Sequence, residues 1–116
     1  MKSKQEVEKF LEEIRVKCKS GIWGLYFLND REKNAQALLD LEIPPNKRTE
    51  IIMELEADDF YRIEEGKYLE QYEMYSFGKT VKGIEVYIKI SITDRNVVCI
   101  SFHEAEFTID YPFKVL

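Results

Sequence analysis

The order of sequence patterns predicts an α+β fold, with N-terminal helices packed on one face of an antiparallel β-sheet. Apolar residues recur at helical spacing in the first part of the chain. Residues 85–107 instead alternate between apolar and polar side chains, with the period of two that is typical of strands. A chain of 116 residues with 45% hydrophobic content is long enough for one domain with a core and too short for two. We therefore expect a single domain over residues 1–116.

The first helix is expected between Ser3 and Lys17. Its buried stripe consists of Val7, Phe10, Leu11 and Ile14. Ser3 can cap the start of the helix because Glu6 follows three residues later, which is the spacing of a capping box. Basic residues crowd the last turn, where their charge suits the helix dipole, and Ser20-Gly21 ends the helix.

Two further helices are expected on either side of a proline pair. Residues 22–28 are aromatic and short, so this segment is either a strand or an extended connection. A second helix is expected over 31–41, and Pro44-Pro45 prevents its continuation. A third helix is expected over 46–55. Its inward-facing residues are Ile51, Ile52 and Leu55.

The sheet is expected to occupy the second half of the chain. Residues 58–61 resemble a helical turn that leads into the sheet region, and residues 64–67 resemble a loop. Residues 72–81 are expected to form a strand. Lys82-Gly83 is a suitable tight turn into the next strand. The alternation over 107–111 predicts one more strand before the chain ends.

The most informative segment is a predicted β-hairpin over residues 85–107, because its two faces differ in chemistry. The apolar face consists of Val86, Ile88, Ile90, Ile92, Val98, Ile100 and Phe102. The opposite face consists of Tyr87, Lys89, Ser91, Cys99, Ser101 and His103. Such alternation predicts a sheet with one face in the core and the other face in water.

The face pattern also sets the register of this hairpin, since a slip of one residue would bury the polar set. A three-residue loop over 94–96 keeps the faces matched. On the core face the expected pairs are Ile88–Phe102, Ile90–Ile100 and Ile92–Val98. On the other face Tyr87 lies opposite His103, with Cβ atoms about 5 Å apart, and Lys89 lies opposite Ser101. The only histidine of the chain, a tyrosine and a lysine would then share one open patch.

Charge and composition limit the classes of function. The net charge of −5 argues against a protein held to nucleic acid or anionic lipid by its overall charge, while a local basic patch stays compatible with it. We expect no DNA partner for the chain by itself. No cluster of His, Cys and Asp has the spacing of metal ligands, so we expect neither a metal nor another cofactor.

The cysteines and the N-terminus indicate the compartment. Cys18 and Cys99 fit neither a disulfide framework nor a four-ligand metal site, and we expect both to be reduced thiols. The opening MKSKQEVEKF carries charges where a signal peptide needs an apolar run, and no stretch approaches 18 apolar residues. These features predict a cytoplasmic protein that neither spans nor binds a membrane.

Four blocks in order carry a resemblance to a known family: AQALLDL, IIMELEADDFYR, VYIKI and ISFHEAE. Together they resemble the MqsR-type toxins of bacterial toxin–antitoxin pairs, which share the RelE-like α+β fold and cleave messenger RNA. The resemblance covers roughly Ala35 to Glu106 and is densest around DDFYR, VYIKI and ISFHE. It implies a metal-independent endoribonuclease with mRNA as its substrate and a cognate antitoxin protein as its partner.

The resemblance also implies roles for individual residues. The family's basic residue after the Phe-Tyr pair falls on Arg62, and its strand tyrosine falls on Tyr87. Its lysine after the Ser-Phe pair of the final strand falls on His103, which is a departure from the family pattern. A family glutamine aligns with Met74, and Gln71 and Glu73 lie nearby in the sequence.

The chemistry of RNA cleavage requires a similar set of groups. A base must take the 2′-hydroxyl proton, an acid must protonate the leaving 5′-oxygen, and cations must offset the charge that grows on the phosphate. His103 can do either proton transfer because histidine titrates near neutral pH. Tyr87 positions or protonates the reacting groups. As a hypothesis, Arg62, Lys79 and Lys89 hold the phosphate.

A second function stays open at this point: a RelE-like fold that has lost catalysis and acts only as a protein-interaction module. The sequence pI of 5.0 favours it, because phosphate binding normally rests on clustered Lys and Arg. Glu104 and Glu106 next to His103 would repel a phosphate, and Arg62 could pair with Asp58 or Asp59. A positive pocket around Arg62, Lys79, Lys89 and His103 would favour the nuclease.

Overall fold

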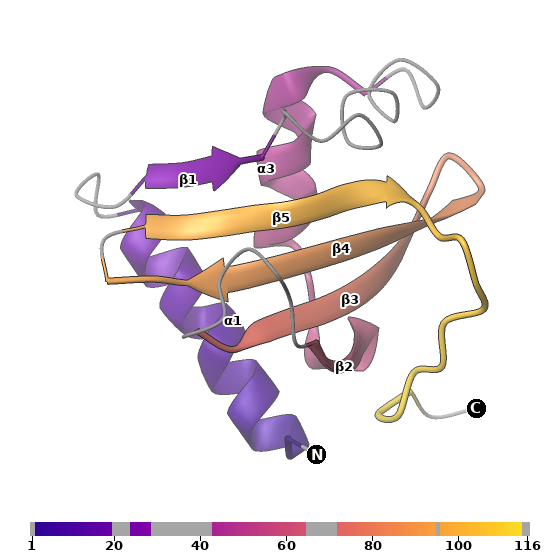
Figure 1. Cartoon of the computed structure of the whole chain (residues 1–116), viewed down its shortest axis with the longest axis horizontal. Coiled ribbons are helices and arrows are strands. Elements are labelled where there is room, and N and C mark those ends of the chain that lie inside the picture. The colour runs from indigo at the N-terminus through magenta and orange to yellow at the C-terminus, as the bar shows by residue number, and fades with distance from the viewer. Residues whose placement is uncertain (1, 20–23, 29–42, 65–71, 95, 115–116) are drawn as a thin grey trace.

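The α+β fold is confirmed by the computed structural model, which describes the chain except for residues 1, 20–23, 29–42, 65–71, 95 and 115–116. Its elements are α1 (Lys4–Lys19), β1 (Gly24–Phe27), α3 (Pro45–Met53), the 3₁₀ turn η1 (Ala57–Asp59), β2 (Phe60–Glu64), β3 (Met74–Val81), β4 (Ile84–Ile92) and β5 (Asn96–Glu104). The sheet order is β1-β5-β4-β3-β2, and only the β1–β5 pair is parallel. Both helices lie on one side of the sheet (Figure 1). The helix expected over 31–41 falls outside the described residues.

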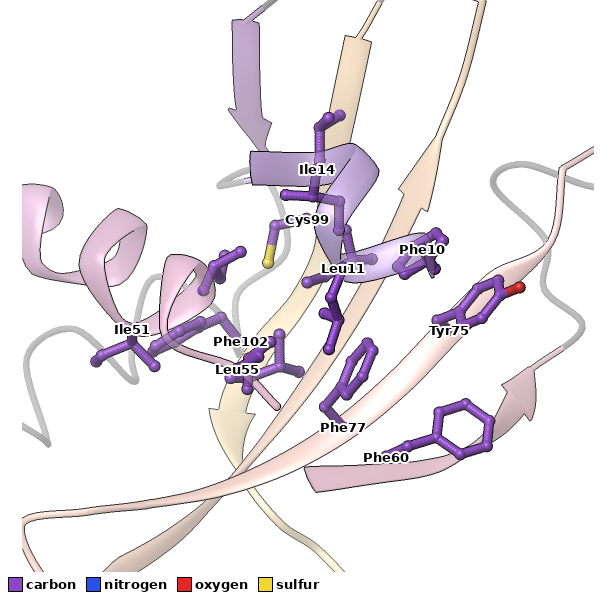
Figure 2. Close-up of a cluster of buried hydrophobic side chains, with 14 of the residues drawn as sticks. Phe10, Leu11, Ile14, Ile51, Leu55, Phe60, Tyr75, Phe77, Cys99 and Phe102 are labelled. Carbon is purple, nitrogen blue, oxygen red and sulfur yellow. The ribbon is translucent and has the colours of Figure 1, made fainter. Parts of the chain in front are cut away.

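The core lies between the helices and this face of the sheet, which we call the helix face. The buried stripe of α1 is confirmed as Val7, Phe10, Leu11 and Ile14. The ring of Phe10 stacks on Tyr75, with ring centroids 3.7 Å apart, above the neighbouring Phe77 (Figure 2). The capping box is also confirmed, since Glu6 N donates to Ser3 Oγ over 3.1 Å and Ser3 N to Glu6 Oε1 over 3.2 Å.

Helix α3 begins at Pro45, the second proline of the pair and one residue before the expected start. Pro44 is extended at ψ 144° and occupies the position before the first helical residue. The inward-facing residues Ile51, Ile52 and Leu55 are buried, although Leu55 lies just past the helix end at Met53. Prolines suit this position because the first helical residues need no N–H partner within the helix.

The segment after α3 differs from the sequence prediction. A helical turn is present as η1, but the chain is extended from Phe60 onward and forms β2 where we expected more turn and then a loop. The Phe60 side chain is fully buried, and its ring meets Phe77 edge-on at 5.8 Å. Burial of this ring on the helix face and hydrogen bonding along β3 favour the extended conformation over a helical one.

The tight turn between β3 and β4 is confirmed. Lys82 and Gly83 have positive φ values of 52° and 79°. Two consecutive left-handed residues match the right-handed twist of the flanking strands.

The register of the β4–β5 hairpin is correct for its outer half and wrong near the turn. Tyr87 pairs with His103, and Lys89 pairs with Ser101, as expected. Beyond Lys89 the register shifts, so that Ile90 pairs with Cys99 instead of Ile100. The expected pair of Ile92 and Val98 is wrong for the same reason, because Ile92 pairs with Val97.

A shorter turn explains this shift. Thr93 N donates to Asn96 O over 2.8 Å, so the hairpin closes one residue earlier than the expected loop over 94–96. A β-bulge then takes up the additional residue of β5. As a result Cys99 enters the core cluster, and its expected position on the water-facing side is wrong.

The C-terminal segment over 105–114 is a tail and not the strand expected over 107–111. The tail crosses the sheet face opposite the helices, which we call the second face. On this face Tyr111 Oη donates to Glu85 Oε2 over 2.7 Å, whereas Phe113, further along the tail, stacks at 5.7 Å on Phe60 of the helix face. A Cβ on Gly78 would collide with Tyr111 and Ile109, so the tail sits directly on the backbone of β3. Side-chain packing on this glycine, rather than strand pairing, holds the segment.

Candidate functional site

The second face brings together the three hairpin residues that the sequence predicts to share a patch. Tyr87 and His103 are paired directly across β4 and β5, and their ring centroids lie 5.6 Å apart. Lys89 Nζ lies 6.0 Å from the centroid of the Tyr87 ring. The cluster of tyrosine, lysine and histidine is therefore a feature of the fold.

The expectation that this face is open to water is wrong at its centre. Tyr87 is only 5% exposed, and Phe107 from the tail packs edge-on against its ring at 5.6 Å. Ser76, Ser91 and Ser101 are also buried. Phe107 of the tail covers Tyr87, whereas Lys89 on β4 and His103 on β5 keep partial exposure.

Arg62 reaches the same face from the edge strand β2. It pairs with Ser76, whose Oγ donates to Arg62 O over 2.7 Å and accepts from Arg62 N at 3.3 Å. The guanidinium lies over the Tyr61 ring, with Cζ 4.7 Å from the ring centroid. The Arg62 side chain stays 55% exposed, so a ligand can reach it.

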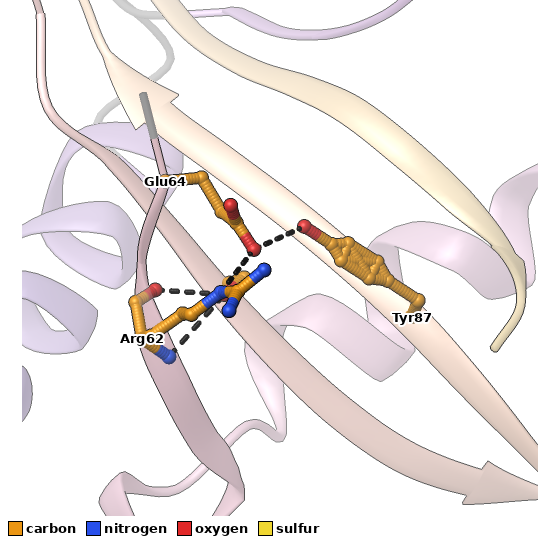
Figure 3. A network of polar contacts seen from close by, with 4 residues as sticks. Arg62, Glu64 and Tyr87 are labelled. Atoms are coloured by element: carbon orange, nitrogen blue, oxygen red, sulfur yellow. Dashed lines mark hydrogen bonds and ion pairs between the residues drawn. The ribbon is translucent and has the colours of Figure 1, made fainter. Parts of the chain in front are cut away.

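Glu64 joins Arg62 to Tyr87. Arg62 Nε donates to Glu64 Oε1 over 2.8 Å, and Tyr87 Oη donates to the same oxygen over 3.0 Å (Figure 3). The pairing of Arg62 with Asp58 or Asp59 that the sequence left open does not occur; Glu64 takes that role.

Sequence analysis missed Glu64 because it placed this residue in a loop. The signal that could have revealed it is alternation within FYRIE, which places residues 62 and 64 on one face once the segment is a strand.

The network keeps both donors protonated. Burial, followed by the negative charge of Glu64 and the hydrogen bond to it, raises the pKa of the Tyr87 hydroxyl well above its usual value. The hydrogen bond to Glu64 also raises the pKa of Arg62. Tyr87 is therefore a fixed hydrogen-bond donor at physiological pH, and Arg62 is a fixed cation.

His103 is oriented by the backbone. Its Nδ1 lies 2.9 Å from the carbonyl oxygen of Glu104. A carbonyl only accepts, so Nδ1 carries a proton and Nε2 is the ring nitrogen left to contact a ligand.

Glu104 and Glu106, the acidic residues close to His103 in the sequence, lie in different places in the structure. Residue pairing places Glu104 opposite the core residue Val86, so its side chain belongs to the helix face. It does not share the face of His103. Glu106 lies on the exposed part of the tail.

The structure does not bring Lys79 to this cluster. Lys79 pairs with Val86 on β4, which places its side chain on the helix face, and its Nζ binds Asp59 Oδ2 at 3.3 Å. The residues at and near the family's glutamine position are not brought to this cluster as a group either. Met74 is buried on the second face opposite Glu64, Glu73 binds Lys2 at 3.0 Å, and Gln71 lies outside the described residues.

Taken together, fold and site define a single-sheet α+β domain with an Arg–Glu–Tyr network and one histidine on its second face. Among the described residues, no group of three or more His, Cys, Asp or Glu side chains could hold a metal ion. In the same part of the chain, no helix is long and apolar enough to cross a membrane. Comparison with protein-family models, curated proteins and solved structures finds no match.

Proposed function

We propose that this chain is a metal-independent endoribonuclease of the RelE-like, MqsR-type class, a cytoplasmic toxin that cleaves mRNA and is neutralised by a cognate antitoxin protein. One observation carries the proposal: three different strands bring Arg62, Tyr87 and His103 to one part of the second face. The resemblance aligns all three positions with functional residues of the family, and His103 stands where the family has a lysine.

The roles follow from the chemistry of each group. Arg62 offers a planar, exposed guanidinium that suits a phosphate. The hydroxyl of Tyr87 is held protonated, so it serves as a hydrogen-bond donor that orients or stabilises the phosphate. His103 supplies a proton-transfer group through Nε2. Lys89 adds positive charge next to Tyr87, whereas Lys79 lies on the other side of the sheet.

The test is induced expression in a bacterial host, followed by growth and transcript integrity, together with purified protein and RNA in excess EDTA. Wild type is expected to stop growth and cut RNA with the chelator present. His103→Ala and Arg62→Ala should each lose at least about 10²-fold in cleavage rate. Lys79→Ala is the matched control for Lys89→Ala, and it should keep its activity because it lies on the helix face.

A non-catalytic interaction module is the second candidate, and specific contacts favour it. Glu64 already neutralises Arg62, the tail covers Tyr87, and the chain carries a net charge of −5. A folded wild type that binds a protein partner but leaves RNA intact at micromolar enzyme would select this alternative and reject the nuclease.

A further inference from the structure

A row of aromatic rings crosses the second face from the edge strand β2 to β5, and the tail supplies one of its members. The Phe107 ring of the tail lies between Tyr61 and Tyr87, with ring centroids 5.8 Å and 5.6 Å away. Tyr87 continues the row to His103. The functional roles considered so far use Tyr87 and His103 and give none to Phe107.

Phe107 is the member of the row that faces solvent. It is 45% exposed, whereas Tyr87 is 5% exposed. Its ring plane makes angles of 40° with Tyr61 and 65° with Tyr87, so neither neighbour lies parallel to it. Rings in the core differ, because Phe10 and Tyr75 stack within 7° of parallel. Among the described residues no ring stacks in parallel on Phe107, which leaves a flat apolar surface for a ligand.

The tail holds the exposed Phe107 ring in place from both sides. Two residues earlier, Ala105 N donates to Glu85 O over 2.9 Å. Two residues later, Ile109 is 5% exposed and lies against the backbone of β3. Residues 106–108 between these anchors are exposed. An aromatic surface fixed in this way loses little conformational freedom when a ligand binds, which favours binding.

Positive charge lies near the exposed ring on two sides. The Arg62 guanidinium lies over Tyr61, with Cζ 4.7 Å from the ring centroid, and its side chain is 55% exposed. Lys89 Nζ lies 6.0 Å from the centroid of the Tyr87 ring. Each cation is therefore separated from Phe107 by a single aromatic ring. An aromatic surface beside cations suits a nucleotide, because the base has a π face and the phosphate is negative.

Resting on the proposed function, which makes RNA the substrate, we infer that Phe107 is a substrate-binding residue that stacks on one unpaired base of a single-stranded RNA. The phosphates lie toward Arg62 and Lys89 and away from Glu106, whose charge repels them. Single-stranded RNA fits because its bases can splay out onto an aromatic ring, whereas bases in a duplex are stacked on one another. The sequence resemblance ends at Glu106 and assigns no role to Phe107.

The alternative role of Phe107 is to cover Tyr87 and nothing more. Another apolar side chain of similar size would provide the same cover, and loss of the cover would make the site easier to reach. Substitution by leucine separates the two roles, since leucine keeps apolar bulk and lacks a π face. Phe107→Leu should weaken RNA binding if the ring stacks on a base. It should leave binding unchanged or strengthen it if the ring is only a cover.

The experiment measures the affinity of an uncleavable 2′-O-methyl oligouridylate and of an abasic strand with the same backbone. Wild type should bind the base-containing strand at least about 10-fold more tightly. Phe107→Leu should weaken binding of that strand by about 10-fold and leave binding of the abasic strand unchanged. Phe107→Trp, which offers a larger π face, should bind at least as tightly as wild type. Tyr26→Leu is the matched control, because Tyr26 is 56% exposed on the opposite edge strand and should bind like wild type.

Salt dependence separates base stacking from phosphate contact. Arg62→Ala should lower the slope of log Kd against log salt concentration by about 1, because it removes a cation from the phosphates. Phe107→Leu should keep the wild-type slope, since it changes no charge. Unchanged binding of the abasic strand also shows that Phe107→Leu keeps the folded arrangement of the cations.

The outcomes distinguish the role of Phe107 from the nuclease itself. Equal affinity of wild type for the two strands, or unchanged or tighter binding of the base-containing strand by Phe107→Leu, overturns the role of Phe107. A wild type that binds neither strand overturns it as well. Cleavage of unmodified RNA in EDTA tests the nuclease separately. A wild type that prefers the base-containing strand but leaves RNA intact rejects the nuclease, and the role of Phe107 in RNA binding stands.

Discussion

The two faces of the sheet are both buried, but by different means. The helix face buries aromatic and aliphatic side chains such as Phe77 and Ile88 against α1 and α3. The second face buries a tyrosine and three serines, and a tail without regular secondary structure packs on the tyrosine. One face is stabilised mainly by apolar contact and the other depends on satisfied polar groups.

Hydrogen bonds explain why the polar face tolerates burial. Ser76 Oγ donates to Arg62 O over 2.7 Å, and Ser91 Oγ donates to Glu73 O over 2.7 Å. Tyr87 donates to Glu64. A buried hydroxyl without a partner costs about 1–3 kcal/mol, so these bonds remove that penalty on the second face. Alternation in a sequence therefore marks chemistry on each face, and it does not by itself mark exposure.

The largest effect is expected on the helix face. Phe77→Ala should lower the free energy of unfolding by about 3–5 kcal/mol, because its ring is fully buried between Phe10 and Phe60. Urea unfolding followed by circular dichroism measures this. Val16→Ala is the control, since Val16 is 58% exposed on α1 and should change stability by less than about 0.5 kcal/mol. Equal losses in the two variants would contradict our assignment of the core.

A smaller effect is expected where the tail rests on β3. Gly78→Ala places a Cβ against Tyr111 and Ile109, so the tail must shift, at a cost of about 1–3 kcal/mol. Hydrogen exchange should increase over residues 105–113 while α1 keeps its protection. Thr80→Ala, an exposed position on the same strand, provides the control. Unchanged exchange in the tail of Gly78→Ala would show that this contact does not hold the tail.

Features that depend on local spacing could be predicted from the sequence. The buried stripe of α1 and its capping box follow from the spacing of residues within one helix. The pairing of Tyr87 with His103 follows from the alternation of two strands joined by one short turn. The cluster of Tyr87, Lys89 and His103 was predictable for this reason.

Features that depend on tertiary contacts could not be predicted. The bulge beyond Lys89 results from a turn that closes at Thr93, and strand β2 forms because Phe60 packs on Phe77. Glu64 was missed with β2, and the cover over Tyr87 was missed with the tail. In both cases the decisive partner is distant in sequence, and the only local signal was the short alternation within FYRIE.

Removing one hydroxyl tests the polar network of the second face. Tyr87→Phe loses the hydrogen bond to Glu64 but keeps the ring contacts with His103 and Phe107, so we expect a loss of about 1–2 kcal/mol. Tyr26→Phe removes a hydroxyl from a side chain that is 56% exposed, and it should be nearly neutral. The midpoints of urea unfolding of the two variants, each compared with wild type, measure these losses, provided that the m-values are equal. A neutral Tyr87→Phe would mean that the network adds no stability and is retained for chemistry.

The smallest effect at neutral pH is expected at Cys99, which the β-bulge turns into the core. Burial raises the pKa of its thiol from 9.0 to about 12, and Sγ donates to Ser101 O over 3.3 Å. The folded state therefore keeps a proton that the unfolded state loses, so this group lowers stability as pH rises from about 9 toward 12. Cys99→Val should change stability by less than about 1.5 kcal/mol at pH 7 and should weaken that alkaline loss.

Thiol chemistry provides the direct measurement of that burial. In Cys18→Ser the remaining thiol should react with a disulfide reagent at pH 8 only as fast as the protein unfolds, because the Cys99 side chain is 1% exposed. In Cys99→Val the half-buried Cys18 should react in the native state. Fast labelling of Cys99 in native Cys18→Ser would show that its side chain faces water, as alternation alone predicts. That result would contradict the bulge.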